Sequence, residues 1–118
     1  MSTSKANYHA TAELKILIAE DHTLIRKMTK QIIKSSHPSV TYTETDNTND
    51  LIMAAKTGQF DLLVLDIFLT DGNTMSLLPA IRVMQPDAAI LFHSMCSESL
   101  YAKRLILNGA NGFLNKCR

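Results

Sequence analysis

The sequence predicts an α/β fold in which helices cover both faces of a parallel sheet. Three short apolar runs, at 15–19, 61–65 and 88–92, lack the alternation of half-exposed strands, which is typical of strands buried on both faces. Amphipathic helical patterns lie between these runs, so strands and helices alternate along the chain. The size agrees, because 118 residues that are 46% hydrophobic can form one small domain around one core.

Two weaker segments complete a set of five expected strands. Residues 40–43 alternate between apolar and polar side chains, as an edge strand does, and residues 112–114 form a very short run. Because the three most apolar strands belong in the middle of the sheet, the predicted strand order is 2-1-3-4-5. This is the flavodoxin-like doubly wound order, with right-handed crossovers between its parallel strands.

Four helices are expected between the strands. The first runs from about 23 to 35, and its apolar face is formed by Leu24, Ile25, Met28 and Ile32. The second ends at Gly58, and its candidate N-caps are Asn47, Thr48 and Asn49. The third begins near Ser76, because Pro79 then lies in its first turn. The fourth ends at Gly109, since glycine suits the left-handed conformation after a helix.

The composition excludes several classes of protein. Twelve Lys and Arg against 11 Asp and Glu give a net charge of +1, which argues against a dedicated nucleic-acid surface. No apolar run reaches the roughly 18–20 residues of a membrane span, and the N-terminus lacks the apolar core of a signal peptide. Cys96 and Cys117 are too few for a disulfide framework. We therefore expect a cytoplasmic protein without a membrane partner.

Three carboxylates are expected to meet at one edge of this sheet. Open parallel sheets bind ligands at the carboxyl ends of their strands, where the strand order reverses. That point lies between the first strand, which is followed by Glu20 and Asp21, and the third, which ends at Asp66. A hard divalent cation relieves the repulsion within such a cluster, and oxygen ligands with room for water favour Mg²⁺. The alternative is that these are solvated acids at strand ends.

Two further groups should reach the same edge, Ser94 after the fourth strand and Lys116 after the fifth. A carboxylate that accepts a phosphoryl group needs these groups. Asp66 would attack phosphorus, Mg²⁺ and Lys116 would neutralise the transferring oxygens, and Ser94 would donate a hydrogen bond to the product. A lone Ser or Lys at a strand end is usually structural or solvated, so the inference depends on all five residues together.

Four segments carry these residues, Ile16-Leu-Ile-Ala-Glu-Asp-His22, Asp61-Leu-Leu-Val-Leu-Asp66, Asp71-Gly72 and Asn108-Gly-Ala-Asn-Gly-Phe-Leu-Asn-Lys116. Together they resemble the receiver domain of bacterial two-component response regulators, over about residues 14–118. The Asp-His-x-Leu-Ile-Arg and Gly-Phe-Leu-Asn-Lys-Cys segments are similar to the NarL/FixJ (LuxR-type) subfamily. The resemblance implies that Asp66 accepts phosphate from a histidine kinase or phosphotransfer protein.

The resemblance also implies roles for individual residues. Mg²⁺ would be bound directly by Asp21, Asp66 and the backbone carbonyl of Phe68, and through water by Glu20. On phosphorylation Ser94 would move inward and Phe113 would follow, which changes the surface between the fourth and fifth strands. This switch would control an output such as transcription, through a C-terminal DNA-binding helix-turn-helix domain that lies outside this chain. A homodimer is possible, and no catalysis is expected beyond self-phosphorylation and self-dephosphorylation.

Two histidines near the site are interpreted as supporting residues. His22 follows the acidic pair at the start of a helix, where the subfamily likeness favours a structural role. His93 lies at the end of the fourth strand and is interpreted as a core histidine.

Three positions depart from the family pattern: Thr70 and Cys117 stand where proline is common, and Met95 stands where a small residue is usual. Met95 keeps open a pseudo-receiver, an interaction module that works without phosphorylation. A Mg²⁺-dependent phosphatase of the haloacid-dehalogenase kind would need a second acid where Phe68 stands.

The ends of the chain complete the expected organisation. Residues 1–13 are polar and aperiodic and should form a tail before the receiver domain of residues 14–118. Receiver domains that this one resembles end in a fifth helix, so the domain is expected to be truncated after its fifth strand. We expect part of one sheet face to be covered by a continuation of the chain, by another copy or by the tail.

Overall fold

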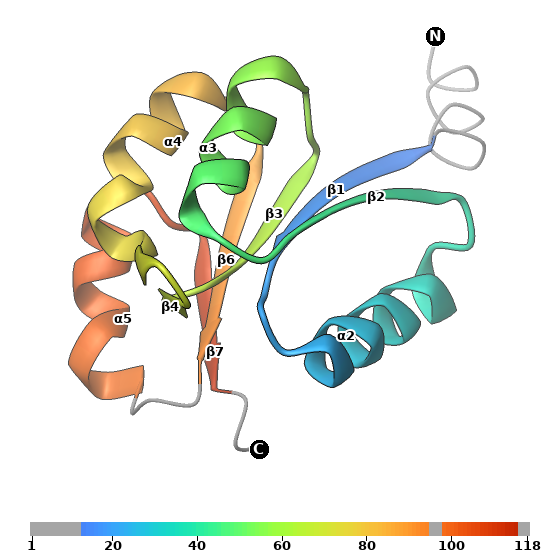
Figure 1. Cartoon of the computed structure of the whole chain (residues 1–118), viewed down its shortest axis with the longest axis horizontal. Helices are drawn as coiled ribbons and strands as arrows, with labels where there is room; N and C mark the ends of the chain where they lie inside the picture. The colour runs from blue at the N-terminus through green and yellow to red at the C-terminus, as the bar shows by residue number, and fades with distance from the viewer. Residues whose placement is uncertain (1–12, 95–97, 116–118) are drawn as a thin grey trace, which may run out of the picture.

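The sheet is parallel and five-stranded, in the order β2-β1-β3-β6-β7 (Figure 1). The structure is a computed structural model that describes residues 13–94 and 98–115, with side chains described for 13–93 and 102–114. The strands are β1 (Leu14–Ala19), β2 (Val40–Thr45), β3 (Leu62–Asp66), β6 (Ala89–Ser94) and β7 (Gly112–Asn115). The predicted fold class and strand order are therefore confirmed, with the three most apolar strands in the middle.

The helices also lie in the predicted gaps. They are α2 (Thr23–Ser36), α3 (Thr48–Thr57), α4 (Leu78–Met84) and α5 (Glu98–Leu107), and the 3₁₀ turn η1 (Thr74–Leu77) precedes α4. Of the three candidate caps of α3, Asn47 occupies the N-cap, and its side chain accepts a hydrogen bond from the Asp50 N–H. Pro79 lies in the first turn of α4, and Gly109 adopts a φ of +113° after α5.

A short hairpin after β3 was not predicted. It consists of β4 (Phe68–Leu69) and β5 (Gly72–Asn73), which pair antiparallel and lead into η1. Strands of two residues are too short to carry a periodic signal, so their positions cannot be predicted from periodicity. The helical segment before Pro79 also begins at Thr74 rather than near Ser76, because its first turn is 3₁₀.

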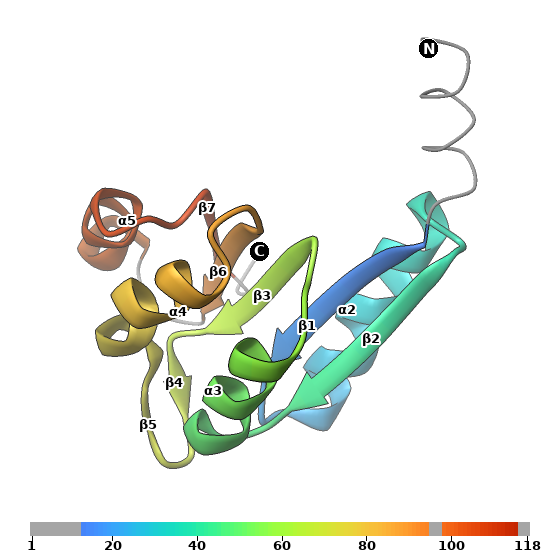
Figure 2. The same ribbon diagram turned by 90° about the horizontal axis from the view of Figure 1, so that it is seen from above.

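The two faces of the sheet are covered unequally. Figure 2 shows α3, α4 and α5 on one face and α2 on the other. The larger core lies on the three-helix face, where Phe92 and its sheet neighbours contact Leu51, Ile81 and Leu105 from the helices. The smaller core contains Ile16, Ile18 and Val64, with Ile33 of α2 packed against them.

Apolar side chains are exposed on the α2 face. None of the residues of α2 is fully buried, and Leu24, Met28 and Ile32 are 69%, 49% and 69% exposed. Leu114 of β7 is 57% exposed, and the strand register places it on the same sheet face as Val64.

Within the described residues, no helix is long and apolar enough to cross a membrane.

Candidate functional site

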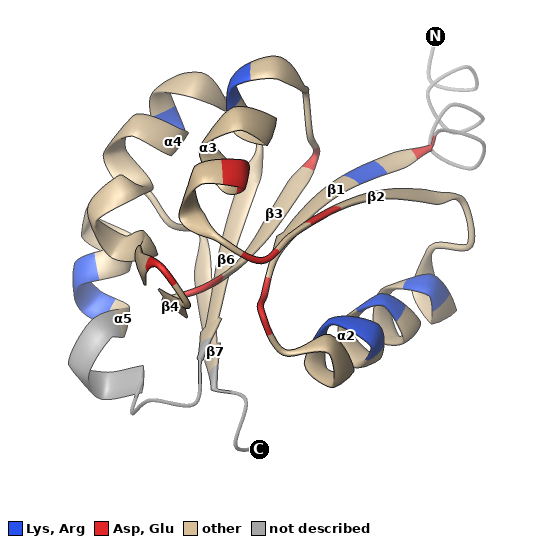
Figure 3. Cartoon of the chain, viewed as in Figure 1, with Lys and Arg blue, Asp and Glu red and all other residues tan. Residues whose placement is uncertain are grey.

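The candidate site lies where the carboxyl ends of β1 and β3 meet. The two strands are paired in parallel, with Ala19 opposite Leu65, so the residues that follow β1 lie beside the end of β3. Figure 3 shows acidic positions at both strand ends. One ligand atom from each of Glu20, Asp21, His22 and Asp66 lies within 4.8 Å of the others. The structure therefore brings together the three carboxylates that the strand order predicts, and adds an imidazole.

The Glu20 carboxylate is buried and lies among nitrogen donors. It is 0% exposed, and its Oε2 accepts a hydrogen bond from the His22 backbone N–H at 3.1 Å. The His22 ring Nδ1 lies 2.9 Å from the same oxygen, while the His93 ring Nε2 lies 3.9 Å from Oε1. Arg26 donates to the Glu20 backbone oxygen at 2.6 Å. These contacts fix the first acid of the cluster in one orientation.

Asp21 supplies an oxygen that suits a cation. Its Oδ1 is closed off from solvent and accepts no hydrogen bond from the described residues, although His22 Nδ1 lies 3.2 Å away. Buried carboxylate oxygens are costly unless a donor or a metal ion satisfies them. The carboxylates of Asp21, Glu20 and Asp66 repel one another at this distance, and a hard divalent cation between their oxygens would relieve that repulsion.

The Asp66 carboxylate ends β3 and is nearly buried, with 4% exposure. Its Oδ1 accepts a hydrogen bond from the Phe68 backbone N–H at 3.3 Å. Its backbone carbonyl accepts a hydrogen bond at 2.5 Å from the hydroxyl of Thr74, which also lies 3.2 Å from the Ile67 oxygen. Thr74 is fully buried, so the start of η1 is tied to the main chain of this aspartate.

The turn between β4 and β5 is fixed against α3 by Asp71. The Asp71 carboxylate accepts hydrogen bonds from the Thr48 backbone N–H at 2.7 Å and from the Thr48 hydroxyl at 2.9 Å. These hydrogen bonds lower the pKa of Asp71 below its usual value, because they stabilise the ionised form. Gly72 lies close to the same threonine, since a Cβ on it would lie 3.4 Å from the Thr48 methyl group. The turn of the hairpin that carries Phe68 is thus held against the start of α3.

The other predicted site residues are described only in part. Ser94 ends β6, the neighbour of β3, but its side chain lies outside the described residues, as does all of Lys116. Met95 and Cys117 also lie outside them. Phe113 is half-buried in β7 opposite Phe92 and packs against the larger core. The structure thus places Ser94 at the expected sheet edge by its backbone alone.

Two residues that lie beside the acidic cluster, Thr74 and His93, are not among the site residues that the sequence predicts. In the sequence, Thr74 cannot be told from any other threonine at the start of a helix. Its contact with Asp66 depends on the β4–β5 hairpin, which the sequence does not predict. His93 is buried, at 8% exposure, which agrees with its interpretation as a core histidine. Its alignment with Asp66 across β3 and β6 could have indicated that it lies near the acids.

The fold and the site define a class of protein: a doubly wound α/β domain with a cluster of carboxylates at the carboxyl ends of its central strands. Comparison with known proteins gives the family: residues 16–118 match the response regulator receiver domain. The chain belongs to this receiver-domain family, whose members are phosphoacceptor switches in two-component signal transduction.

Curated relatives support this assignment. The Fimbriae Z protein of Salmonella typhimurium is 33% identical over 101 residues, which cover 86% of this chain and 48% of that protein. The DNA-binding transcriptional regulator NtrC of a Bradyrhizobium species is 31% identical over 101 residues, 86% of this chain and 21% of NtrC. The chain thus spans about half the length of the Fimbriae Z proteins it matches.

Solved structures share the fold at lower sequence identity. A response regulator from Burkholderia pseudomallei, with a phosphorylated aspartic acid, a calcium ion and citrate, aligns with a TM-score of 0.80 at 19% identity, over 90% of this chain and 61% of that one. The receiver domain of NarL from Mycobacterium tuberculosis aligns with a TM-score of 0.77 at 22% identity, over 90% and 86% of the two chains.

Proposed function

We propose that Asp66 accepts a phosphoryl group from a histidine kinase or phosphotransfer protein. The observation that carries this proposal is the nearly buried Asp66 carboxylate at the end of β3, beside the acidic pair after β1. An Asp66 carboxylate oxygen forms a bond to phosphorus as the bond between phosphorus and the donor breaks, and the donor leaves with the bonding electron pair. The family membership and the phosphorylated aspartate of the Burkholderia relative support the same chemistry.

The residues of the cluster fit a magnesium ion. Asp21, Asp66 and the carbonyl of Phe68 would bind it directly, and Glu20 would bind it through water. The buried Asp21 Oδ1 supports this assignment, because no described residue gives it a hydrogen bond. When bound, Mg²⁺ supplies positive charge for the oxygens of the phosphoryl group. In this proposal Glu20 keeps its place through the His22 N–H and the Arg26 guanidinium.

Ser94 and Lys116 complete the proposed site. Lys116 would neutralise charge on the transferred oxygens, and Ser94 would donate a hydrogen bond to one of them in the product. Movement of Ser94 would vacate space for Phe113, whose ring is only half-buried in the resting structure. The switch would thus reach the β6–β7 edge of the sheet.

The output that we propose is control of transcription. NtrC is a DNA-binding transcriptional regulator by name, and the relatives are longer than this chain. We assign the chain to the NarL/FixJ subfamily, with a C-terminal helix-turn-helix domain outside these residues, a cytoplasmic location and a possible homodimer.

Incubation with acetyl phosphate and Mg²⁺, followed by mass spectrometry, tests the proposal. The parent should gain one base-labile phosphate on Asp66, with acetate as the leaving group. Asp66→Asn should gain none, while Asp87→Asn, which removes an exposed acid just before the start of β6 and away from the carboxyl ends of the strands, should behave like the parent. Phosphate uptake by Asp66→Asn at the parental rate would show that another residue is the acceptor.

A further inference from the structure

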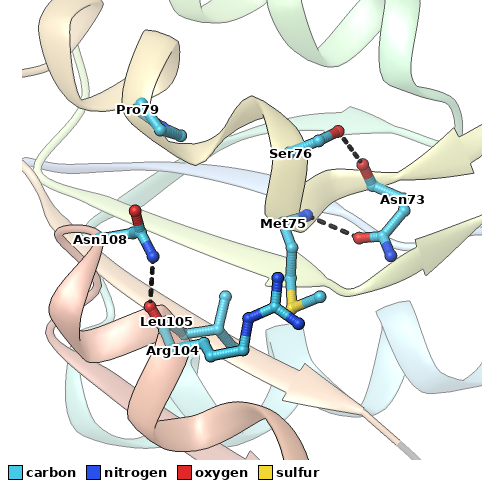
Figure 4. A pocket seen from close by; sticks show the side chains of 7 residues that line it. All are labelled: Asn73, Met75, Ser76, Pro79, Arg104, Leu105 and Asn108. Carbon is cyan, nitrogen blue, oxygen red and sulfur yellow. Dashed lines mark hydrogen bonds between the residues drawn. The ribbon is translucent and has the colours of Figure 1, made fainter.

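A pocket of about 350 Å³ lies between the η1 segment and the C-terminal half of α5. Figure 4 shows the side chains that line it, with Met75, Ser76 and Pro79 on one side and Arg104 and Leu105 on the other. We call it the η1–α5 pocket. None of the residues assigned to phosphoryl transfer lines it, so it is distinct from the acidic site.

The floor of the η1–α5 pocket is apolar. Leu105 is 1% exposed and belongs to the larger core, and Met75 is partly buried against the same core. Pro79 adds an exposed apolar edge at the start of α4. A methionine beside a leucine gives an adaptable apolar surface that accepts side chains of different shape. The floor therefore suits one apolar side chain of a ligand.

Arg104 gives the pocket its charge. The other described arginines have acceptors, because Arg26 binds Glu44 and the Glu20 carbonyl, while Arg82 binds several carbonyl oxygens around Gly109. For the Arg104 guanidinium, no hydrogen bond or ion pair is found among the described residues. The pocket thus contains a planar cation with five N–H donors, for which the described residues offer no acceptor.

The amide groups around Arg104 are largely used within the chain. Asn73 Oδ1 accepts from the Met75 N–H at 2.8 Å, and Asn108 Nδ2 donates to the Arg104 carbonyl at 2.7 Å. The Asn73 amide nitrogen makes no hydrogen bond to the described residues, which adds a second donor to the pocket. A ligand that fits must therefore bring hydrogen-bond acceptors and negative charge.

We propose that the η1–α5 pocket is a docking site for an acidic peptide segment of a partner protein. One carboxylate would form a paired hydrogen bond with Arg104, the geometry in which guanidinium and carboxylate match best. A neighbouring apolar side chain would fill the floor at Met75 and Leu105. A nucleic acid fits less well, because the net charge is only +1 and no aromatic side chain lines the pocket.

The pocket is joined to the proposed phosphoacceptor through Thr74. This buried residue lies between Asn73 and Met75 of the pocket wall, and its hydroxyl donates to the Asp66 carbonyl at 2.5 Å. Any shift of the Asp66 main chain therefore reaches the wall directly. This part of the inference rests on the proposed function: phosphorylation of Asp66 should change the affinity of the docked peptide, and the peptide should change phosphorylation in return.

Selection from a display library of random peptides against the full chain tests the docking site. Enriched peptides should carry Asp or Glu next to an apolar residue, and Arg104→Gln should weaken their binding at least about tenfold, as loss of a charge-assisted hydrogen bond does. Lys103→Gln is the matched control, because it removes an exposed charge one position away and should leave binding within about twofold. Replacing the peptide's acid by its amide should have the same effect as Arg104→Gln.

The outcomes separate docking from phosphorylation. The pocket assignment would be overturned by enriched peptides that lack acidic residues, or that bind the Arg104→Gln variant as tightly as the parent. It would also be overturned if a random oligonucleotide displaced the peptides equally well from the parent and from the Arg104→Gln variant. The selected peptide is then titrated into parent and Asp66→Asn after treatment with acetyl phosphate and Mg²⁺. An affinity change in the parent alone supports the link through Thr74. Peptide binding that stays constant while Asp66 is phosphorylated would refute the link, whereas absence of phosphate on Asp66 would refute the proposed function instead.

Discussion

Replacement of Thr74 by valine should destabilise the domain through a single hydrogen-bonding group. Thr74 is fully buried, and its hydroxyl donates to the Asp66 carbonyl at 2.5 Å, with the Ile67 carbonyl 3.2 Å away. Valine has nearly the same volume, so no cavity forms and the loss is electrostatic. The Ile67 oxygen keeps its hydrogen bond from the Thr74 backbone N–H at 2.8 Å. The Asp66 carbonyl is therefore the group that loses a partner.

The expected loss follows from the removal of one buried hydrogen bond to the Asp66 carbonyl. Such a hydrogen bond contributes about 0.5–1.5 kcal/mol net, so we expect a decrease of about 1 kcal/mol in the free energy of unfolding. Urea unfolding of a small domain has a slope of roughly 1–3 kcal/mol per molar, so the midpoint should fall by roughly 0.3–1 M. The slope itself should stay constant, because the variant exposes the same surface on unfolding.

Thr57→Val is the matched control. Thr57 also donates its hydroxyl to a backbone carbonyl, that of Met53 at 2.8 Å, but it is exposed at the end of α3. Water replaces the lost donor there, so the free energy of unfolding should change by less than about 0.5 kcal/mol. Equal midpoints for Thr74→Val and the parent, or equal losses for the two variants, would refute the argument that burial of the Asp66 contact sets its strength.

Two further predictions concern charge. Asp21→Ala should abolish Mg²⁺ binding more completely than Glu20→Ala, measured by calorimetric titration, because Asp21 would bind the ion directly and Glu20 through water; equal affinities for the two variants would contradict this arrangement. The hydrogen bond from Lys30, with help from Arg26, holds the pKa of Glu44 below its usual value of 4.5. A lowered pKa stabilises the folded state above the usual value and loses that contribution as the pH falls through the folded-state pKa. Glu44→Gln should therefore be less stable than the parent near pH 7, and the two urea midpoints should converge below pH 4.5; a difference that persists in acid would exclude this ion pair as its cause.

The strand order and the convergence of the acids could be predicted from the sequence. Both follow from local properties, since strands buried on two faces are uniformly apolar and parallel strands end at the same edge. Once β1 and β3 are neighbours, Glu20 and Asp66 must lie close together, whatever the details of packing. The turn signals at Asn47, Pro79 and Gly109 are local in the same sense.

The features that could not be predicted depend on contacts between distant segments. The β4–β5 hairpin has two residues in each strand, and its position is set by the contact of Asp71 with Thr48, 23 residues earlier. The helical period identifies Leu24, Met28 and Ile32 as one face of α2, but it does not reveal that this face is largely exposed. The η1–α5 pocket likewise exists only because α5 packs beside an irregular turn.

The exposed apolar face of α2 also affects the calorimetric behaviour of the domain. Apolar surface raises the heat capacity on unfolding only if it is buried in the folded state. Leu24, Ile32 and Leu114 are more than half exposed in the folded chain, so their hydration changes little on unfolding. The heat-capacity increment should therefore be smaller than the apolar composition suggests, and the curve of stability against temperature correspondingly flatter. Any ligand or segment that covers this face would increase the heat-capacity change on unfolding and make the stability depend more steeply on temperature.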